Sequence, residues 1–259
     1  MSYPSARPSP TPSPPRRLNI GIGNFFFRYR NNVFPILFAA AVLVGRPQVV
    51  LGNAALDRVL IATGAVTALT GEAVRLITIG YEYIERGGKK GKVYASHLVQ
   101  GGMYGLTRNP MYVGNILIAV GISLFSGAPF AYFVVVPLFL FIYQAIVMTE
   151  ENYLRGQFGK DYEDYCVRVP RFVPAFRGVR RAFGGMRYNW KRALRQDLST
   201  IAALLLGLSL LPLWRKFFLR GFDAAKAIAF RTAVLSSLIL ACYAVLVVLK
   251  KQKRLHDAE

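Results

Sequence analysis

Hydrophobic residues are gathered along this chain into six blocks, which polar or glycine-rich segments separate. A transmembrane helix needs about 20 consecutive apolar residues, and most of the blocks come close to that length. The pattern therefore predicts an all-α fold, a multi-pass transmembrane bundle of about six membrane helices. The blocks cover residues 33–51, 59–79, 112–125, 130–148, 198–213 and 229–249.

The segments between the blocks indicate how the helices connect. Residues 126–129, Ser-Gly-Ala-Pro, are short enough to join the third and fourth blocks as an antiparallel helical hairpin. The fifth block is short for a full span, so a re-entrant or interfacial helix is an alternative there. The predicted loop at residues 214–226 also carries four basic residues although it would face outside.

A charged pair lies inside the second block. Glu72 and Arg75 are three residues apart, so a helix places them on one face. Charges at that depth must face protein or a wet cavity rather than lipid. We favour an interhelical salt bridge over a contact with substrate.

The charge of the chain agrees with a membrane protein. The net charge is +20, and 54% of the residues are hydrophobic. The basic residues lie beside the apolar blocks, where anionic headgroups and the positive-inside rule account for them, so nucleic acid is not the expected partner. Residues 168–195 hold nine basic residues and no acidic one, and the chain ends with a second basic run. We expect both termini to be cytoplasmic, in a bacterial plasma membrane; no protein partner is indicated.

The same patterns divide the chain into five parts. They are a disordered Pro-rich tail (1–17), an interfacial segment with the first helix (18–57), a membrane core (58–175), a basic cytoplasmic segment (176–197), and two further helices with a basic tail (198–259).

Two cysteines and two histidines are too few for a disulfide framework or for a metal site built from Cys and His. We expect no metal. Any catalysis must use carboxylates, arginines, tyrosines, backbone groups or a bound cofactor.

The candidate chemistry lies in residues 97–174. Because a short hairpin returns the chain to the side that it left, Arg108 before the third block should lie near Glu150 and Glu151 after the fourth. This predicts a pocket at the cytoplasmic membrane face with a cation, two carboxylates and several aromatic rings. S-adenosylmethionine suits such a pocket, since Arg108 can pair with its carboxylate, the glutamates with its ammonium or ribose, and aromatic faces with its sulfonium. Methyl transfer needs little beyond alignment and exclusion of water.

The ordered motifs of this region resemble those of the integral-membrane isoprenylcysteine carboxyl methyltransferases and the phospholipid N-methyltransferases. They are His-x-Val (97–99), Gly-x-Tyr (102–104), Arg-Asn-Pro-x-Tyr-x-Gly (108–114), Glu-Glu (150–151), Phe-Gly-x-x-Tyr-x-x-Tyr (158–165) and Val-Pro-Arg (169–171). The resemblance covers residues 58–175. It implies a membrane methyltransferase that uses S-adenosylmethionine on a lipid, prenylated or other membrane-partitioned substrate.

The resemblance also implies the roles of particular residues. The cofactor would be bound by His97, Gly102, Tyr104, Arg108, Asn109, Pro110, Tyr112, Glu150 and Glu151; the substrate by Tyr162, Tyr165 and Arg171; the catalytic residues would be Arg171, Glu151 and Asn109.

Asn109 departs from the family, which has His at this position. Asn still forms hydrogen bonds but cannot titrate near neutral pH. If the histidine only orients the cofactor, activity survives the change; if it is a base, the enzyme is slow, altered in substrate or inactive. Two alternatives remain. Asn109 favours an inactive binding or scaffold protein of the same fold, and a similar Arg-x-Pro-x-Tyr segment in sterol reductases leaves open a related enzyme that uses a nicotinamide cofactor.

Overall fold

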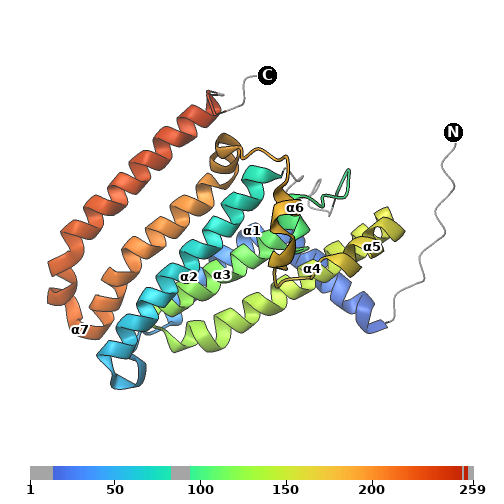
Figure 1. Cartoon of the computed structure of the whole chain (residues 1–259). Helices are drawn as coiled ribbons and strands as arrows, with labels where there is room; N and C mark the ends of the chain where they lie inside the picture. Colours follow the sequence, from blue (N-terminus) through green and yellow to red (C-terminus); the bar gives the residue numbers. More distant parts are fainter. Residues whose placement is uncertain (1–13, 83–93, 253, 256–259) are drawn as a thin grey trace.

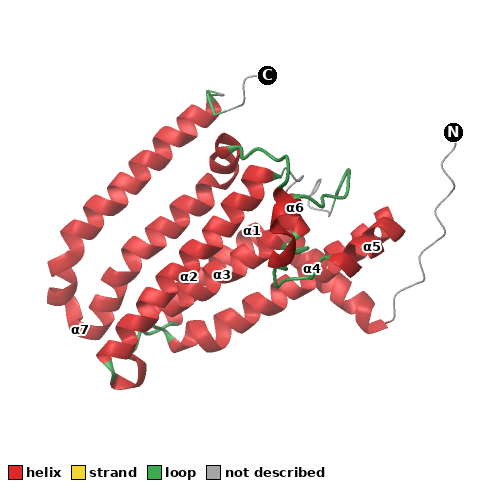
Figure 2. Cartoon of the chain, in the orientation of Figure 1, coloured by secondary structure: helices red, strands yellow, loops and turns green. Residues whose placement is uncertain are grey.

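The computed structural model describes residues 14–82, 94–252, 254 and 255, and over these residues the chain is helical with no β-strand. Figure 2 shows the helices and the loops that join them. The predicted all-α class is therefore confirmed. Residues 1–13, and with them most of the predicted disordered tail, lie outside the described residues, as do residues 83–93 of the polar segment after the second block.

Three helical stretches of the described chain are long and apolar enough to cross a membrane: Ala54–Tyr81, Ala131–Phe158 and Trp190–Lys251. Two shorter apolar stretches, Asn32–Val44 and Pro110–Ser126, accompany them. All six predicted blocks fall within these five stretches or overlap them. The fifth and sixth blocks both lie in the stretch Trp190–Lys251.

Helix α1 (Pro14–Val44) begins within the predicted tail and runs through the predicted interfacial segment without a break. Residues 14–17 are therefore helical rather than part of a disordered tail. The helix ends earlier than the first apolar block does. Pro47 explains this end, since proline lacks an N–H and disfavours helical backbone in the residue before it.

Helices α2 (Ala54–Tyr81) and α3 (Pro110–Ser126) pack closely along their lengths. Glycines allow the close approach, as small residues do between membrane helices. A Cβ atom at Gly71 would lie 2.6 Å from the Gly114 carbonyl oxygen, and one at Gly121 would lie 2.6 Å from the Gly64 carbonyl oxygen. Pro110 occupies the first turn of α3, where its missing N–H costs nothing.

The chain then reverses as predicted for residues 126–129. Gly127 adopts a left-handed φ of 67° at the end of α3, and a π-helical turn (Ala131–Val135) leads into α4 (Val136–Phe158). Helix α1 packs on α4 through an aromatic core that includes Phe27, Phe139 and Tyr143. Because α4 continues to Phe158, the paired glutamates lie inside this helix rather than beyond its end.

Helices α5 (Lys160–Arg168) and α6 (Val179–Phe183) follow, and α7 (Trp190–Lys251) completes the fold. Helix α7 is broken at Gly221, which has φ 81° and ψ −176°. Figure 1 shows two antiparallel arms that turn back at this point beside α2. Residues 190–220 are helical without interruption, so the fifth block is part of a longer helix. The loop predicted at residues 214–226 is instead helical except at Gly221, where the chain reverses direction.

Two buried ion pairs attach the first arm of α7 to the core. Arg75 of α2 binds Asp197, with Nε 2.9 Å from Oδ2, and Arg215 binds Asp57, with Nη2 2.7 Å from Oδ2. Arg215 also donates to the Ser126 carbonyl at 2.7 Å. The predicted interhelical salt bridge in the second block is thus present, with Asp197 as the partner of Arg75 and Glu72 a further 3.6 Å contact.

Replacing Arg215 by Met should destabilise the protein by about 3–5 kcal/mol, because Asp57 would be left buried without its partner. Thermal unfolding of the detergent-purified protein measures this. The Asp57→Ala, Arg215→Met double variant should recover part of the loss, while Arg231→Met, at an exposed position of the second arm, should change little. Equal melting temperatures for Arg215→Met and Arg231→Met would contradict a stabilising pair.

Candidate functional site

A cavity of about 1150 Å³ lies between α1, α3, α4 and the first arm of α7, and residues 94–99 and α5 cover one end. Binding sites for single small molecules usually measure about 300–1,000 Å³, so this cavity exceeds that range. Its walls are mostly apolar, and its charged groups gather mainly at the end near the start of α3.

Most residues of the predicted site line this cavity. They are His97, Tyr104, Arg108, Asn109, Tyr112, Glu150, Glu151, Tyr162 and Tyr165. Three others lie just outside the lining: Gly102 begins the 3₁₀ turn Gly102–Gly105 with a left-handed φ of 55°, Pro110 starts α3, and Arg171 contacts Glu151 from the segment after α5.

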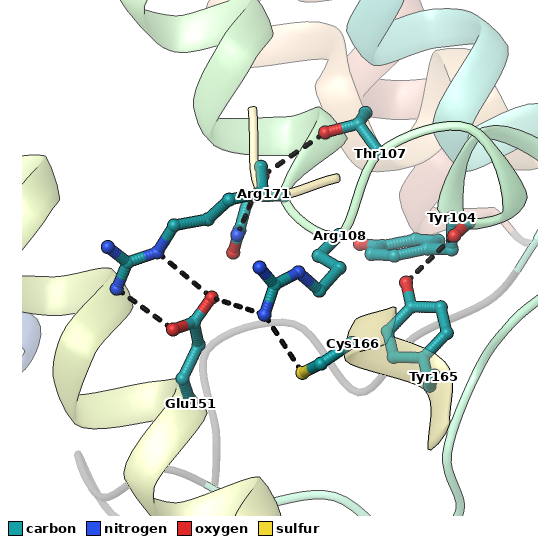
Figure 3. A network of polar contacts seen from close by, with 8 residues as sticks. Tyr104, Thr107, Arg108, Glu151, Tyr165, Cys166 and Arg171 are labelled. Carbon is teal, nitrogen blue, oxygen red and sulfur yellow. Dashed lines mark hydrogen bonds and ion pairs between the residues drawn. The ribbon is translucent and has the colours of Figure 1, made fainter. Parts of the chain in front are cut away.

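The Glu151 carboxylate is shared by two arginines (Figure 3). Arg171 binds it with two parallel hydrogen bonds, Nε to Oε1 at 3.0 Å and Nη2 to Oε2 at 2.8 Å. Arg108 Nη1 lies 3.3 Å from Oε1. The hairpin thus brings Arg108 and Glu151 together as the sequence predicts. Two guanidinium groups on one carboxylate leave the cluster with a net positive charge.

Arg108 keeps a free donor inside this cluster. Its Nη1 also donates to the Cys166 thiol at 2.8 Å, but its buried Nε has no hydrogen-bond partner among the described residues. Burial disfavours the charge, but Glu151, Cys166 and Tyr162 together outweigh burial, and the pKa of the Arg108 guanidinium is raised. Arg108 is therefore a permanent cation with unused hydrogen-bonding capacity at the cavity wall.

The backbone before α3 is fastened to the segment after α5. The Arg108 amide donates to the Pro170 carbonyl at 2.9 Å, and the Thr107 hydroxyl donates to the carbonyl of Arg171 at 3.2 Å. Asn109, only 7% exposed, donates from Nδ2 to that same Arg171 carbonyl at 3.0 Å. Asn109 therefore positions Arg171, and a histidine ring N–H is also a donor that can form such a bond.

Two tyrosines of α5 cover the cluster. Tyr162 is 1% exposed, and the Tyr165 hydroxyl donates to the Tyr104 carbonyl at 2.7 Å. Burial raises the pKa of both phenols, so they stay neutral at physiological pH. Their rings and Tyr104 provide aromatic surface beside a charged group.

The paired glutamates have different partners. Glu150 turns away from Arg171 and accepts a hydrogen bond from the Tyr112 hydroxyl at 2.6 Å. Arg30 of α1 lines the cavity near this pair and contributes to the electrostatics of both groups. Glu150 and Tyr112 thus form a second polar site, further toward α1.

Several residues of the charged cluster and of the cavity wall were not predicted from the sequence. Cys166 follows Tyr165 in the predicted motif but carries no signal of its own. Arg75, Asn115 and Thr200 form a polar network within the cavity wall, in which Arg75 Nη2 donates to the Thr200 hydroxyl at 3.1 Å. The charged pair in the second block was the available signal, because charges within membrane helices commonly face a cavity. No group of three or more His, Cys, Asp or Glu that could hold a metal occurs in the described part of the chain.

Comparison with known proteins agrees with this geometry. Residues 58–161 match the family described as phospholipid methyltransferase. The cobalt-zinc-cadmium resistance protein CzcN of Cupriavidus metallidurans is 27% identical over 166 residues, which cover 63% of this chain and 72% of that protein. No solved structure matches the chain. The matched segment contains most of α2, all of α3 and α4, and the contact between Arg108 and Glu151. The match of residues 58–161 to the phospholipid methyltransferase family is the resemblance that the sequence motifs predicted.

Proposed function

We propose that this chain is an integral-membrane methyltransferase that takes its methyl group from S-adenosylmethionine and delivers it to a lipid, prenylated or other membrane-partitioned substrate. The observation that carries the proposal is the Arg108–Glu151–Arg171 cluster at the wall of a cavity that extends into the apolar body of the bundle. The cofactor supplies an electrophilic methyl group on a sulfonium, and methyl transfer then requires an aligned nucleophile and a dry site.

The residues present fit this cofactor. The unpartnered Nε of Arg108 is a buried donor, and the net positive charge of the cluster suits a carboxylate. Glu150 can accept from an ammonium or from ribose hydroxyls. Tyr104, Tyr162 and Tyr165 offer the aromatic faces that stabilise a sulfonium. His97, Gly102, Pro110 and Tyr112 complete the proposed cofactor site.

The same residues suggest how the side chains of the site are held in position. Arg171 fixes the orientation of Glu151 through two hydrogen bonds, and Glu151 in turn fixes Arg108. Asn109 holds the backbone of Arg171, so its proposed role is positioning rather than proton transfer. The acceptor, a carboxylate oxygen or an amine, would approach past Tyr162, Tyr165 and Arg171.

We also propose that the protein lies in a bacterial plasma membrane with both termini in the cytoplasm. The basic segment at residues 168–195 and the basic C-terminal end support this orientation under the positive-inside rule.

S-adenosylmethionine should bind to the detergent-purified protein, and Arg108→Ala and Glu151→Ala should each weaken binding by about 2–5 kcal/mol. Arg108→Ala removes the cation that would pair with the cofactor carboxylate, and Glu151→Ala removes the group that orients Arg108. Isothermal titration calorimetry measures this. Arg177→Ala and Glu163→Ala are matched controls at exposed positions and should bind normally. Unchanged affinity in the Arg108 and Glu151 variants would contradict the proposed site.

The same preparations separate the competing functions. Transfer of a labelled methyl group from S-adenosylmethionine into a bacterial membrane lipid extract is the expected result. Cofactor binding without transfer to any lipid would favour the inactive scaffold, and binding of a nicotinamide cofactor instead would favour the reductase.

Asn109→His should preserve cofactor affinity and melting temperature, since histidine can donate the same hydrogen bond to the Arg171 carbonyl. Asn109→Leu removes the donor and should destabilise the protein by about 1–3 kcal/mol. Thermal unfolding and calorimetry of both variants test this. A large gain in turnover with Asn109→His, without a change in affinity, would instead indicate that a titrating group is missing.

A further inference from the structure

The cavity does not end at the cofactor residues. It follows one face of α3, where Asn115, Ile118, Ile122 and Ser126 line it in succession. From Asn115 to Ser126 the helix rises about 16 Å, at 1.5 Å per residue. The hydrocarbon core of a bilayer is about 30 Å thick, so this part of the cavity spans about one leaflet.

The first arm of α7 forms the wall opposite α3. Ala203, Gly207, Leu211 and Trp214 line the cavity from successive turns of this arm. This wall is apolar, and it lies outside the segment that matches the methyltransferase family. The buried pairs Arg75–Asp197 and Asp57–Arg215 hold the arm to α2 at both ends, and Arg215 also donates to the Ser126 carbonyl of α3. These contacts fix the place of α7 beside α2 and α3.

At Gly207 the α7 wall lies close to Ile122 of the α3 wall, and the cavity remains open between them. A Cβ atom at Gly207 would meet only the Ile122 Cδ1 atom, at 3.7 Å, which is an ordinary van der Waals contact. A larger side chain there would project into the cavity between its polar end and Trp214.

The polar groups at the other end of this passage belong to several elements. Arg30 of α1 lies there with Glu150 of α4 and the Tyr112 hydroxyl, which belong to the proposed cofactor site. A molecule that fills the whole space must therefore have a polar head and a long apolar tail.

We propose that the passage between α3 and α7 holds one hydrocarbon tail of the acceptor lipid, with its head beside Arg30 at the edge of the proposed cofactor site, and that Gly207 determines how long that tail can be. The identification of the bound lipid as the acceptor rests on the proposed function. The passage and the role of Gly207 rest on the cavity alone.

Photolabelling tests the proposal directly. The probe is palmitic acid that carries a diazirine at the end of its chain, added to the full-length protein in detergent. In the wild type the labelled residues should lie at the far end of the passage, around Leu211, Trp214 and Ser126. In Gly207→Phe this labelling should fall by about tenfold or more, because the new ring occupies the path of the tail. A diazirine analogue of octanoic acid should label the wild type and the variant equally, near Asn115.

Two further variants serve as controls. Gly207→Ala should label normally, since its methyl group fits. Leu205→Phe places the same ring on an exposed face of the same helix and should also label normally. Thermal unfolding establishes that each variant is folded, and Gly207→Phe should bind S-adenosylmethionine with unchanged affinity.

Equal palmitate labelling in Gly207→Phe and the wild type, or labelling confined to the outer face of α7, would overturn the proposal. That result is distinct from a failure of the proposed function, which would appear as a wild-type protein that takes up the palmitate probe in the passage but neither binds S-adenosylmethionine nor transfers its methyl group.

Discussion

The structure of the site depends on one carboxylate shared by two guanidinium groups. Glu151 comes from α4, Arg108 from the loop before α3, and Arg171 from the segment after α5, so this contact joins three elements that are distant in sequence. An arginine whose carboxylate partner is itself held by a second arginine is oriented before any ligand arrives. The Asn109 and Thr107 hydrogen bonds to the Arg171 carbonyl hold the backbone in the same arrangement.

The remaining helices form the cavity beside this cluster. Glycines bring α2 and α3 together, and the aromatic core between α1 and α4 keeps a space open beside them. The buried pairs of Arg75 and Arg215 place the first arm of α7 along the remaining side. A buried ion pair contributes little net stability but is costly to break, so these two pairs specify where α7 lies more than they strengthen the fold. The outcome is a polar site that opens into an apolar passage, which suits chemistry on a lipid.

Much of this arrangement can be predicted from the sequence, because two hydrophobic blocks joined by a four-residue turn can pack only as an antiparallel pair, which α3 and α4 form. The approach of Arg108 to Glu151 follows from that hairpin. The partners of Arg75 and Arg215 could not be predicted, since Asp197 and Asp57 lie 122 and 158 residues away in sequence and no local pattern links them. The sequence predicted a longer loop where α7 reverses at Gly221, because the basic residues around it are typical of a solvated segment. The structure shows that one of them, Arg215, is instead buried and paired with Asp57. The different partners of Glu150 and Glu151 could not be predicted either, because two identical adjacent residues give no sign of which tertiary contacts each one makes.

The most direct test of this account is an experimentally determined structure of the protein with S-adenosylmethionine bound. The account predicts that the cofactor carboxylate lies within hydrogen-bonding distance of Arg108 Nε while Glu151 remains bound to Arg171, and that the sulfonium faces the aromatic rings of α5. A cofactor found elsewhere in the molecule, or one that displaces Glu151 from both arginines, would contradict it.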